Sequence, residues 1–301
     1  MISIIICTYN RCEYIYTTLA KVASNNYAAE KYEIILVNNN STDNTASECE
    51  RFANDFPNAP YHYFVETNQG LSYARNRGIQ EAQGDMLVFL DDDAFVGDNY
   101  LETLDKYISS IPDMAAFGGR IEPLFENGET PRWLGKWSYS WVSAIDMGDN
   151  VRLFEGNAYP IGANMGIRKV CFERVGLFNT QLGRTGKNMM GGEEKDLFNR
   201  IKDDGSKIYY LPDIKVQHVI PPQRTTDQYI ERLAEGIGMS ERLRTKQLSN
   251  SAYIKRLGSE AVKWGGTLML ATGYVLRGEA EKGRVLVLFR RKVTKGLVKG
   301  E

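Results

Sequence analysis

The segment Leu87-Val88-Phe89-Leu90-Asp91-Asp92-Asp93 ends an apolar run with three successive aspartates. The apolar part is typical of a strand that is buried on both faces of a sheet. Three adjacent carboxylates repel one another, so a cation or hydrogen-bond donors must compensate them. Because successive side chains of a strand point to opposite sides, we expect Asp91 and Asp93 to share a direction and Asp92 to differ. A solvated turn that caps the following helix is the alternative.

Other runs of strand length share this apolar character: residues 2–6, 32–37 and 61–65, in series with residues 86–90. The stretches between them have the length and polarity of amphipathic helices: residues 13–24, 43–56 and 71–83. This alternation predicts an α/β fold in which helices cover a parallel sheet. In such sheets, ligands bind outside the carboxyl ends of the strands. We therefore expect the site where these strands end.

The composition bounds the class of protein. With 301 residues, of which 43% are hydrophobic and 25% charged, the chain can bury a large core and forms one domain or one domain with an appendage. The net charge of -1 gives no overall attraction to nucleic acid, and we expect no nucleic-acid partner. Residues 277–301 are an exception, because eight Lys or Arg face three Glu there.

The cysteines and the longest apolar stretches indicate a compartment. The four cysteines show no metal-finger spacing and fit a reducing environment. Residues 2–6 are too short for a signal peptide, and residues 264–276 fall well short of the roughly 20 residues that cross a bilayer. We expect a cytoplasmic protein, with peripheral contact to the inner face of the cell membrane as a further expectation.

A glycine and an arginine stand at the start of an expected helix. In the segment Asn68-Gln69-Gly70-Leu71-Ser72-Tyr73-Ala74-Arg75-Asn76-Arg77-Gly78, Gly70 precedes the helix and Arg75 lies about one turn inside it. This arrangement suits an anion, because the amino end of a helix carries positive charge. An ordinary helix with a solvated arginine is the alternative.

Six segments in this order resemble family 2 glycosyltransferases of the GT-A fold. They are Cys7-Thr8-Tyr9-Asn10-Arg11, residues 37–45, residues 68–78, residues 90–93, Gly162-Ala163-Asn164-Met165 and Gly192-Glu193-Glu194-Lys195-Asp196-Leu197. The resemblance implies a Rossmann-like, mostly parallel sheet flanked by helices. It also implies that residues 1–220 bind the nucleotide-sugar and carry catalysis, whereas residues 221–301 form a helical, basic extension.

The same resemblance implies roles for the residues at the strand ends. Tyr9 would stack on the base of the donor, and Arg75 would steady its nucleotide. The aspartate run would hold ribose and a cation, Mn²⁺ or Mg²⁺: Asp93 is the first choice as metal ligand, and Asp91 contacts the ribose or the metal. The implied donor-binding set is Thr8, Tyr9, Asn10, Arg11, Asn38, Asn40, Arg75, Asp91, Asp92, Asn164 and Glu193.

Asn38 departs from the family pattern, which usually has an aspartate that accepts a hydrogen bond from the uracil ring. The amide of Asn38 can accept through its oxygen but also donates. A UDP-sugar is favoured as donor, and a GDP-sugar stays open.

Glu194 occupies the family position of the catalytic base. In inverting transfer, a carboxylate takes the proton of the acceptor hydroxyl as that oxygen attacks the anomeric carbon. The alternative is that Glu193, Glu194 and Asp196 are first-turn acids favoured by the helix dipole.

Three further features were assigned roles. His218 ends a strand-like run and, by the resemblance, completes the metal site or contacts the diphosphate, although a single histidine is more often structural. Asn164 is expected to contact a sugar hydroxyl. The aromatic residues Trp133, Trp137 and Trp141 could stack on a carbohydrate acceptor or pack against the C-terminal helices, and both interpretations stay open.

The C-terminal segment mixes apolar residues, 264–270 and 285–289, with the basic run Arg290-Arg291-Lys292. This mixture resembles an interfacial anchor on anionic lipid. A helical hairpin that closes the catalytic domain or makes a dimer is the alternative.

Together these features predict a metal-dependent, inverting glycosyltransferase of the hexosyltransferase class. It would move a sugar from a nucleotide-sugar to a glycan or lipid-linked acceptor, in bacterial polysaccharide synthesis. Two alternatives share much of the same site: a non-catalytic nucleotide-sugar-binding protein and a nucleotidyltransferase.

Overall fold

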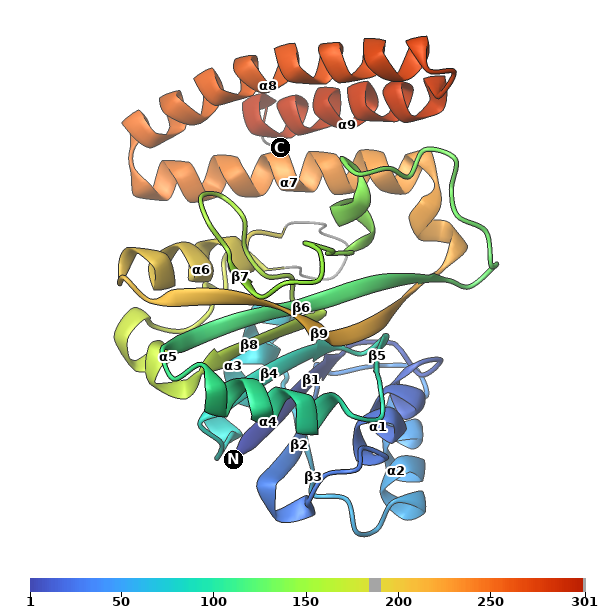
Figure 1. Ribbon diagram of the computed structural model, residues 1–301, viewed down its shortest axis with the longest axis vertical. Helices are drawn as coiled ribbons and strands as arrows, with labels where there is room; N and C mark the ends of the chain where they lie inside the picture. Colours follow the sequence, from blue (N-terminus) through green and yellow to red (C-terminus); the bar gives the residue numbers. More distant parts are fainter. Residues whose placement is uncertain (184–190, 300–301) are drawn as a thin grey trace. The chain divides into compact units, whose positions relative to one another are not determined.

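The computed structural model describes residues 1–183 and 191–299, which form two compact units (Figure 1). The first unit comprises Met1–Pro123, Ser143–Thr180 and Glu193–Val219. The second unit comprises Leu124–Val142 and the described residues of Gln181–Gly192 and Ile220–Glu301. The expected α/β fold with a helical C-terminal extension is confirmed.

Four parallel strands form one half of the sheet: β1 (Ile2–Thr8), β2 (Tyr32–Asn38), β3 (Tyr61–Val65) and β4 (Met86–Asp91). Strand β1 lies in the middle, where Cys7 pairs with Val37 of β2 and with Asp91 of β4. This register brings the carboxyl ends of the three strands to one edge of the sheet. The polar residues that follow the strands therefore start from neighbouring positions.

The other half of the sheet is antiparallel, and its order continues β4-β8-β6-β9-β5. Its strands are β5 (Ala94–Val96), β6 (Met114–Phe125), β8 (Asn164–Arg168) and β9 (Lys207–Ile220), with β7 (Arg152–Leu153) paired to β9. The strand-length runs found in the sequence correspond to the parallel half and, up to His218, to the end of β9, whereas β5, β6 and β8 were not predicted. Strand β9 pairs His218 with Ala94, directly after the aspartate run. A segment distant in sequence thus reaches the edge where β4 ends.

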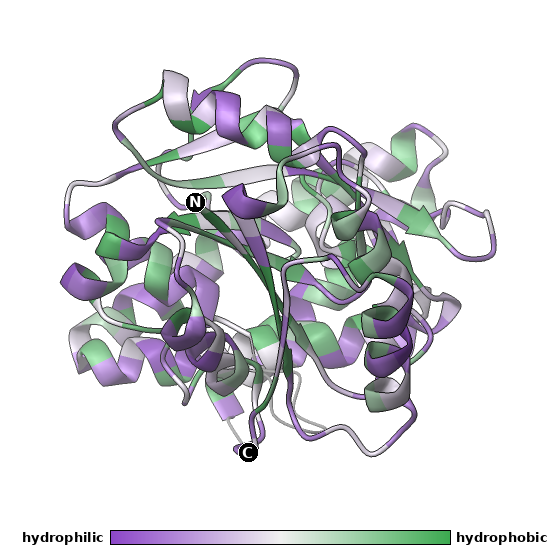
Figure 2. Ribbon diagram, turned by 90° about the horizontal axis from the view of Figure 1, so that it is seen from below, coloured by the Kyte–Doolittle hydropathy of each residue, from purple (hydrophilic) through white to green (hydrophobic). Residues whose placement is uncertain are grey.

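Helices cover both faces of the sheet and alternate strand residues contact each layer. One layer contains α1 (Ile15–Ala23), α2 (Thr45–Asp55) and α4 (Tyr100–Ser110), which pack with Ile4 and Ile6. The other contains α3 (Leu71–Glu81), α5 (Lys169–Val175) and α6 (Glu193–Asp203), which pack with Ile5. In Figure 2 the strand that begins at the marked N-terminus is hydrophobic, whereas the helices alternate in hydropathy. The short 3-10 helices are η1 (Ala29–Lys31), η2 (Tyr139–Val142) and η3 (Pro222–Thr225).

The second unit contains three long helices: α7 (Asp227–Leu248), α8 (Asn250–Leu276) and α9 (Ala280–Lys299). Thr226 and Ser249 cap α7 and α8 by accepting hydrogen bonds from backbone amides. A Cβ on Gly296 of α9 would lie 2.1 Å from the carbonyl oxygen of Glu235 of α7, so this glycine permits the two helices to pack closely. Among residues 1–183 and 191–299, no helix has the length and apolar character needed to cross a membrane.

Trp133, Trp137 and Trp141 have different surroundings. Trp141 is buried, and its ring stacks on Phe289 of α9 with centroids 3.9 Å apart. Trp133 is also buried, and it stacks on Trp141 and donates its indole N–H to the carbonyl of Thr225. Trp137 is 54% exposed. Packing against the tail helices therefore accounts for Trp133 and Trp141, and only Trp137 presents a ring to a possible acceptor.

Candidate active site

The loops after β1 and β2 are held together by direct hydrogen bonds. The amide of Asn10 donates to the hydroxyl of Ser41 at 3.0 Å, and the amide of Thr42 donates to Oδ1 of Asn10 at 2.8 Å. Asn10 and Asn40 both have positive φ angles, 53° and 59°, a conformation that asparagine tolerates better than most residues. The two loops thus form one polar rim.

Asn38 and Asn39 brace the sheet edge from within. The amide of Asn38 donates to the hydroxyl of Tyr63 at 2.8 Å and accepts from the amide of Ser41 at 2.9 Å. Asn39 accepts a hydrogen bond of 2.8 Å from the amide of Gly70, at the start of α3. Sequence reasoning had given Asn39 no role, although its place between Asn38 and Asn40 after a buried strand could have indicated one. Tyr9, on the neighbouring loop, is 41% exposed and leaves its ring accessible.

Two of the three aspartates converge on a histidine. Nε2 of His218 lies 2.9 Å from Oδ1 of Asp93 and 3.8 Å from Oδ2 of Asp91. His218 and Asp93 are buried, whereas Asp91 is partly exposed. The Arg11 guanidinium lies 3.2 Å from Asp93 and 3.7 Å from Asp92, so it compensates part of the negative charge. Burial raises the pKa of Asp92 to about 7, against the effect of Arg11 and with that of Asp93.

The donor set fits a divalent cation. Asp91, Asp93 and His218 each offer one ligand atom, and the three atoms lie within 4.8 Å of one another. Ligands on opposite sides of a magnesium-sized ion lie about 4.2 Å apart, so only a small contraction is required. Carboxylate oxygens suit Mg²⁺ and Mn²⁺, and an imidazole nitrogen is also an ordinary ligand of transition metals. The three residues selected from the sequence as metal ligands are thus brought together.

A buried arginine joins this cluster to a second pair of acids. Nη1 of Arg75 lies 3.2 Å from Oε1 of Glu193, and Nη2 donates to Oε1 of Glu194 at 2.9 Å. Nη2 also lies 3.9 Å from Oδ1 of Asp91. Arg75 and Glu193 are buried, and the side chain of Glu194 is mostly buried. Glu193 and Glu194 therefore face Arg75 of α3 rather than solvent.

Burial also changes the proton affinity of Glu194. It raises the pKa of this carboxyl to about 7; the charge of Arg75 acts against the shift, and the charges of Glu193 and Asp91 add to it. Because the carboxylate is the form that accepts a proton, this shift makes Glu194 a stronger base than an ordinary glutamate.

Gly162 is required by the close approach of this pair. A Cβ at Gly162 would lie 2.0 Å from Nη2 of Arg75 and 2.2 Å from Oε1 of Glu194. The amide of Gly162 in turn donates to Oε1 of Glu194 at 3.0 Å. Sequence reasoning gave this residue no role, and its place two residues before Asn164 in a quoted motif was the available signal.

The side chain of Asn164 forms hydrogen bonds to other parts of the fold and not to the residues described above. Its side-chain nitrogen donates to the carbonyls of Arg120 and Ile214, and its oxygen accepts from the hydroxyl of Tyr100 at 2.7 Å. Its side chain is fully buried and braces β8 against β6, β9 and α4. The predicted contact with a sugar hydroxyl stays a prediction. Both N–H groups of the side chain are engaged, so a sugar hydroxyl would have to donate to the second lone pair of its oxygen. Thr8, from the same donor-binding set, is buried at the end of β1.

This fold and site define a member of a known enzyme class. The sequence profile described as Glycosyl transferase family 2 matches residues 3–176, which is more than half of the chain. The chain therefore belongs to glycosyl transferase family 2, and the family resemblance seen in the sequence is confirmed.

Individual relatives extend the comparison. The chain is 27% identical over 267 residues to a glucosyl-dolichyl phosphate glucuronosyltransferase of Haloferax volcanii. This match covers 85% of this chain and 82% of that protein. It is 35% identical over 130 residues to glycosyltransferase AglE of the same organism, but this match covers only 43% of this chain and 42% of AglE. The chain thus spans less than half the length of the second relative.

Solved structures support the fold. A mannosyltransferase from Pyrobaculum calidifontis in complex with GDP-Man and Mn²⁺ has a TM-score of 0.64 and 20% identity, covering 100% of this chain and 88% of that chain. Staphylococcus aureus TarS 1-349 in complex with UDP-GlcNAc has a TM-score of 0.57 and 16% identity, covering 96% of this chain and 91% of that chain. These likenesses confirm the expected GT-A fold.

Proposed function

We propose that this glycosyltransferase is an inverting, metal-dependent enzyme that transfers a hexose or related sugar from a nucleotide-sugar to an acceptor hydroxyl. The observation that carries the proposal is the position of Arg75. Its guanidinium contacts Glu194 at 2.9 Å and lies 3.9 Å from Asp91. The buried arginine therefore links the proposed base to the group of proposed metal ligands.

The polar rim would bind the nucleotide. Tyr9 would stack on the base, and Asn38 would meet its edge. Asn38 both donates and accepts in this structure, so its amide does not select uracil by itself. A UDP-sugar is the favoured donor and a GDP-sugar is the alternative. The remaining donor contacts in this proposal are Thr8, Asn10, Arg11, Asn40, Arg75, Asp91, Asp92, Asn164 and Glu193.

The proposed metal site is the second part of this proposal. Asp93, Asp91 and His218 would hold Mn²⁺ or Mg²⁺. A divalent cation at this place would neutralise negative charge on the diphosphate as the glycosidic bond breaks. Arg11 already contacts Asp92 and Asp93 in this structure, so it can add positive charge on the same side.

Glu194 would act as the base. The acceptor oxygen forms a bond to the anomeric carbon, the bond from that carbon to the diphosphate breaks, and Glu194 takes the proton of the acceptor hydroxyl. The nucleoside diphosphate leaves with the electrons of the broken bond. Arg75 and the amide of Gly162 both donate to Oε1 of Glu194, which orients the carboxylate.

The acceptor is proposed to be a glycan or a lipid-linked sugar. The name of the Haloferax relative, which specifies glucosyl-dolichyl phosphate, supports a lipid-linked acceptor. A role in bacterial polysaccharide synthesis stays a prediction. We further propose that residues 1–220 carry donor binding and catalysis, and that residues 221–301 contribute the acceptor or membrane side.

Thermal shift with UDP-sugars and GDP-sugars, with and without Mn²⁺, tests donor binding, because a ligand of the folded state raises its apparent stability. Analysis of the products with the responding donor then tests the reaction. Release of a nucleoside diphosphate supports the proposal, and release of pyrophosphate would indicate a nucleotidyltransferase. Donor binding with no transfer to any glycan or lipid-linked acceptor would indicate a non-catalytic binder.

A further inference from the structure

Helix α8 places several polar residues on the face that contacts the neighbouring helices. Glu260 and Thr267 are buried, and Arg256 and Trp264 are partly buried. These residues recur every three or four positions, which places them on one side of the helix. Helices of globular proteins ordinarily place an apolar stripe on this side. The polarity of α8 is therefore reversed.

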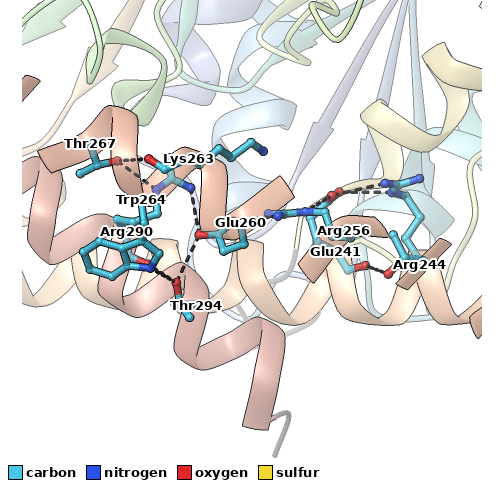
Figure 3. A network of polar contacts seen from close by, with 10 residues as sticks. Glu241, Arg244, Arg256, Glu260, Lys263, Trp264, Thr267, Arg290 and Thr294 are labelled. Carbon is cyan, nitrogen blue, oxygen red and sulfur yellow. Dashed lines mark hydrogen bonds and ion pairs between the residues drawn. The ribbon is translucent and has the colours of Figure 1, made fainter. Parts of the chain in front are cut away.

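The inner polar face is fully engaged in hydrogen bonds (Figure 3). Glu260 accepts from Arg256 at 2.7 Å and from Arg290 of α9 at 3.1 Å. Burial would raise the pKa of Glu260, but these two guanidinium groups lower it below its ordinary value. Thr294 accepts from the indole of Trp264 and donates to Glu260. The network satisfies the buried charges, so α8 is held in this orientation.

The outer face of α8 is apolar. It consists of Ile254, Val262, Leu268, Met269, Val275 and Leu276, which recur on the side opposite the network. All six are exposed: Val262, Met269 and Leu276 reach 78%, 73% and 82%. Single exposed apolar residues are normal, whereas a row along a whole helix marks an interaction surface.

The exposed charges that α8 itself carries have one sign. Lys255, Lys263 and Arg277 are exposed on α8 or at its end. The helix contains one acidic residue, Glu260, and it is buried on the other side. An apolar stripe bordered by cations is complementary to the surface of an anionic bilayer, where the stripe enters the acyl boundary and the cations meet the phosphates.

We propose that the outer face of α8 binds an anionic membrane surface, with the helix lying in the plane of the membrane. No helix among residues 1–183 and 191–299 can span a bilayer, which agrees with contact of this kind. The proposal is independent of the reaction proposed above, because it concerns a surface of the second unit and needs no sugar donor.

A second copy of the chain is the competing occupant of this face. Stable protein interfaces are enriched in aromatic residues, methionine and arginine and depleted in lysine. The outer face holds five aliphatic residues, one methionine and no aromatic residue, and two lysines border it. The aliphatic residues and the lysines favour lipid, whereas Met269 and Arg277 suit either occupant.

The structure changes which residues form the expected anchor. The sequence placed the expected anchor on residues 264–270, which lie in α8, on residues 285–289 and on Arg290-Arg291-Lys292. Val285 and Leu286 are buried, Arg290 pairs with Glu260, and Lys292 pairs with Glu231 of α7. These groups hold the three helices together, so the proposed lipid contact is limited to α8.

Co-sedimentation of the full chain with vesicles tests the proposal. We expect binding to vesicles of phosphatidylcholine mixed with phosphatidylglycerol and much weaker binding to phosphatidylcholine alone. The triple variant Val262→Ser/Met269→Ser/Leu276→Ser should bind at least about tenfold more weakly, since three apolar side chains no longer enter the bilayer. Lys255→Gln and Lys263→Gln should each reduce binding to the anionic vesicles by about fivefold.

A matched control replaces exposed apolar residues elsewhere: Val151→Ser/Val170→Ser/Leu177→Ser. This variant should bind as the native chain does. Circular dichroism and thermal unfolding check that each variant keeps its fold. Absence of native binding to the anionic vesicles, or equal binding by the α8 triple variant, would overturn the proposal. It is also overturned if analytical ultracentrifugation finds a dimer that the α8 variant converts to a monomer, because a second copy then covers this face.

Discussion

Nη2 of Arg75 donates a hydrogen bond of 2.9 Å to Oε1 of Glu194. The arginine comes from α3 and the glutamate from the first turn of α6, so the bond joins two segments that are far apart in the sequence. The guanidinium also contacts Glu193 and lies near Asp91. The buried guanidinium of Arg75 therefore lies beside the carboxylates of Asp91, Glu193 and Glu194 and holds the proposed base in position.

Removal of Arg75 should strongly destabilise the protein. Arg75→Met removes the guanidinium that pairs with the buried Glu193, and breaking a buried pair typically costs about 3–5 kcal/mol. Urea unfolding measures the loss. Arg77→Met on the same helix is the control, because the pair of Arg77 with Glu81 is about one third exposed and should contribute less than about 1 kcal/mol. Equal losses in the two variants would show that the Arg75 cluster is not a structural centre.

Gly162→Ala should impair catalysis without removing any functional group. The added Cβ would meet Arg75 and Glu194 at 2.0 and 2.2 Å, so the pair must move. A displacement of about 1 Å in a catalytic group can cost about a hundredfold in rate, and we expect a loss of this order in kcat. Gly97→Ala is the control, since no atom lies within 4 Å of its Cβ position. Native kcat in Gly162→Ala would contradict the assigned geometry.

Strands buried on both faces were the most predictable part of the fold. The apolar runs at residues 2–6 and 86–90 correspond to β1 and β4, because nothing but continuous burial explains Ile4-Ile5-Ile6. The antiparallel half could not be located in the same way. Strand β6 contains glycine and proline and loses its buried pattern toward its end, so its sequence does not distinguish it from a loop.

The sequence indicated which residues form the site, but it did not indicate which of them pair with one another. Asp91, Asp93 and His218 were chosen together by the family resemblance, and they lie together. Arg75 was expected to steady a nucleotide, yet in this structure it pairs with Glu193 and Glu194. Such a pairing depends on how α3 and α6 pack against the same face of the sheet, and no local pattern in either helix specifies that packing.

The pH dependence of the reaction should follow Glu194. Its pKa is raised by burial to about 7, and the carboxylate is the active form. As the pH rises through this value the active fraction grows, so kcat/KM should fall about tenfold for each pH unit below about 7 and level off above it. Steady-state rates across the acidic range provide the measurement. With an ordinary glutamate as base, the enzyme would lose activity only near about pH 4.3. A fall in kcat/KM that begins at about that pH would contradict the raised pKa.

The metal cluster should control donor binding. Asp93→Asn removes a buried carboxylate from the proposed cation site, so the thermal shift that Mn²⁺ and a nucleotide-sugar produce together should be lost. A chelator added to the native protein should have the same effect. Asp98→Asn changes an exposed aspartate that follows β5, and this variant should retain the full shift. A donor response that persists in Asp93→Asn or in the presence of the chelator would argue against a cation held there.

The central claim is that Glu194 takes the proton of the acceptor, and Glu194→Gln tests it most directly. Glutamine keeps the shape and can still accept a hydrogen bond from Arg75, but it cannot act as a base. With the donor that gives a thermal shift, donor affinity and transfer rate should be measured in the same preparation. We expect native donor affinity and a transfer rate reduced by at least about a hundredfold. Transfer at the native rate would contradict the assignment.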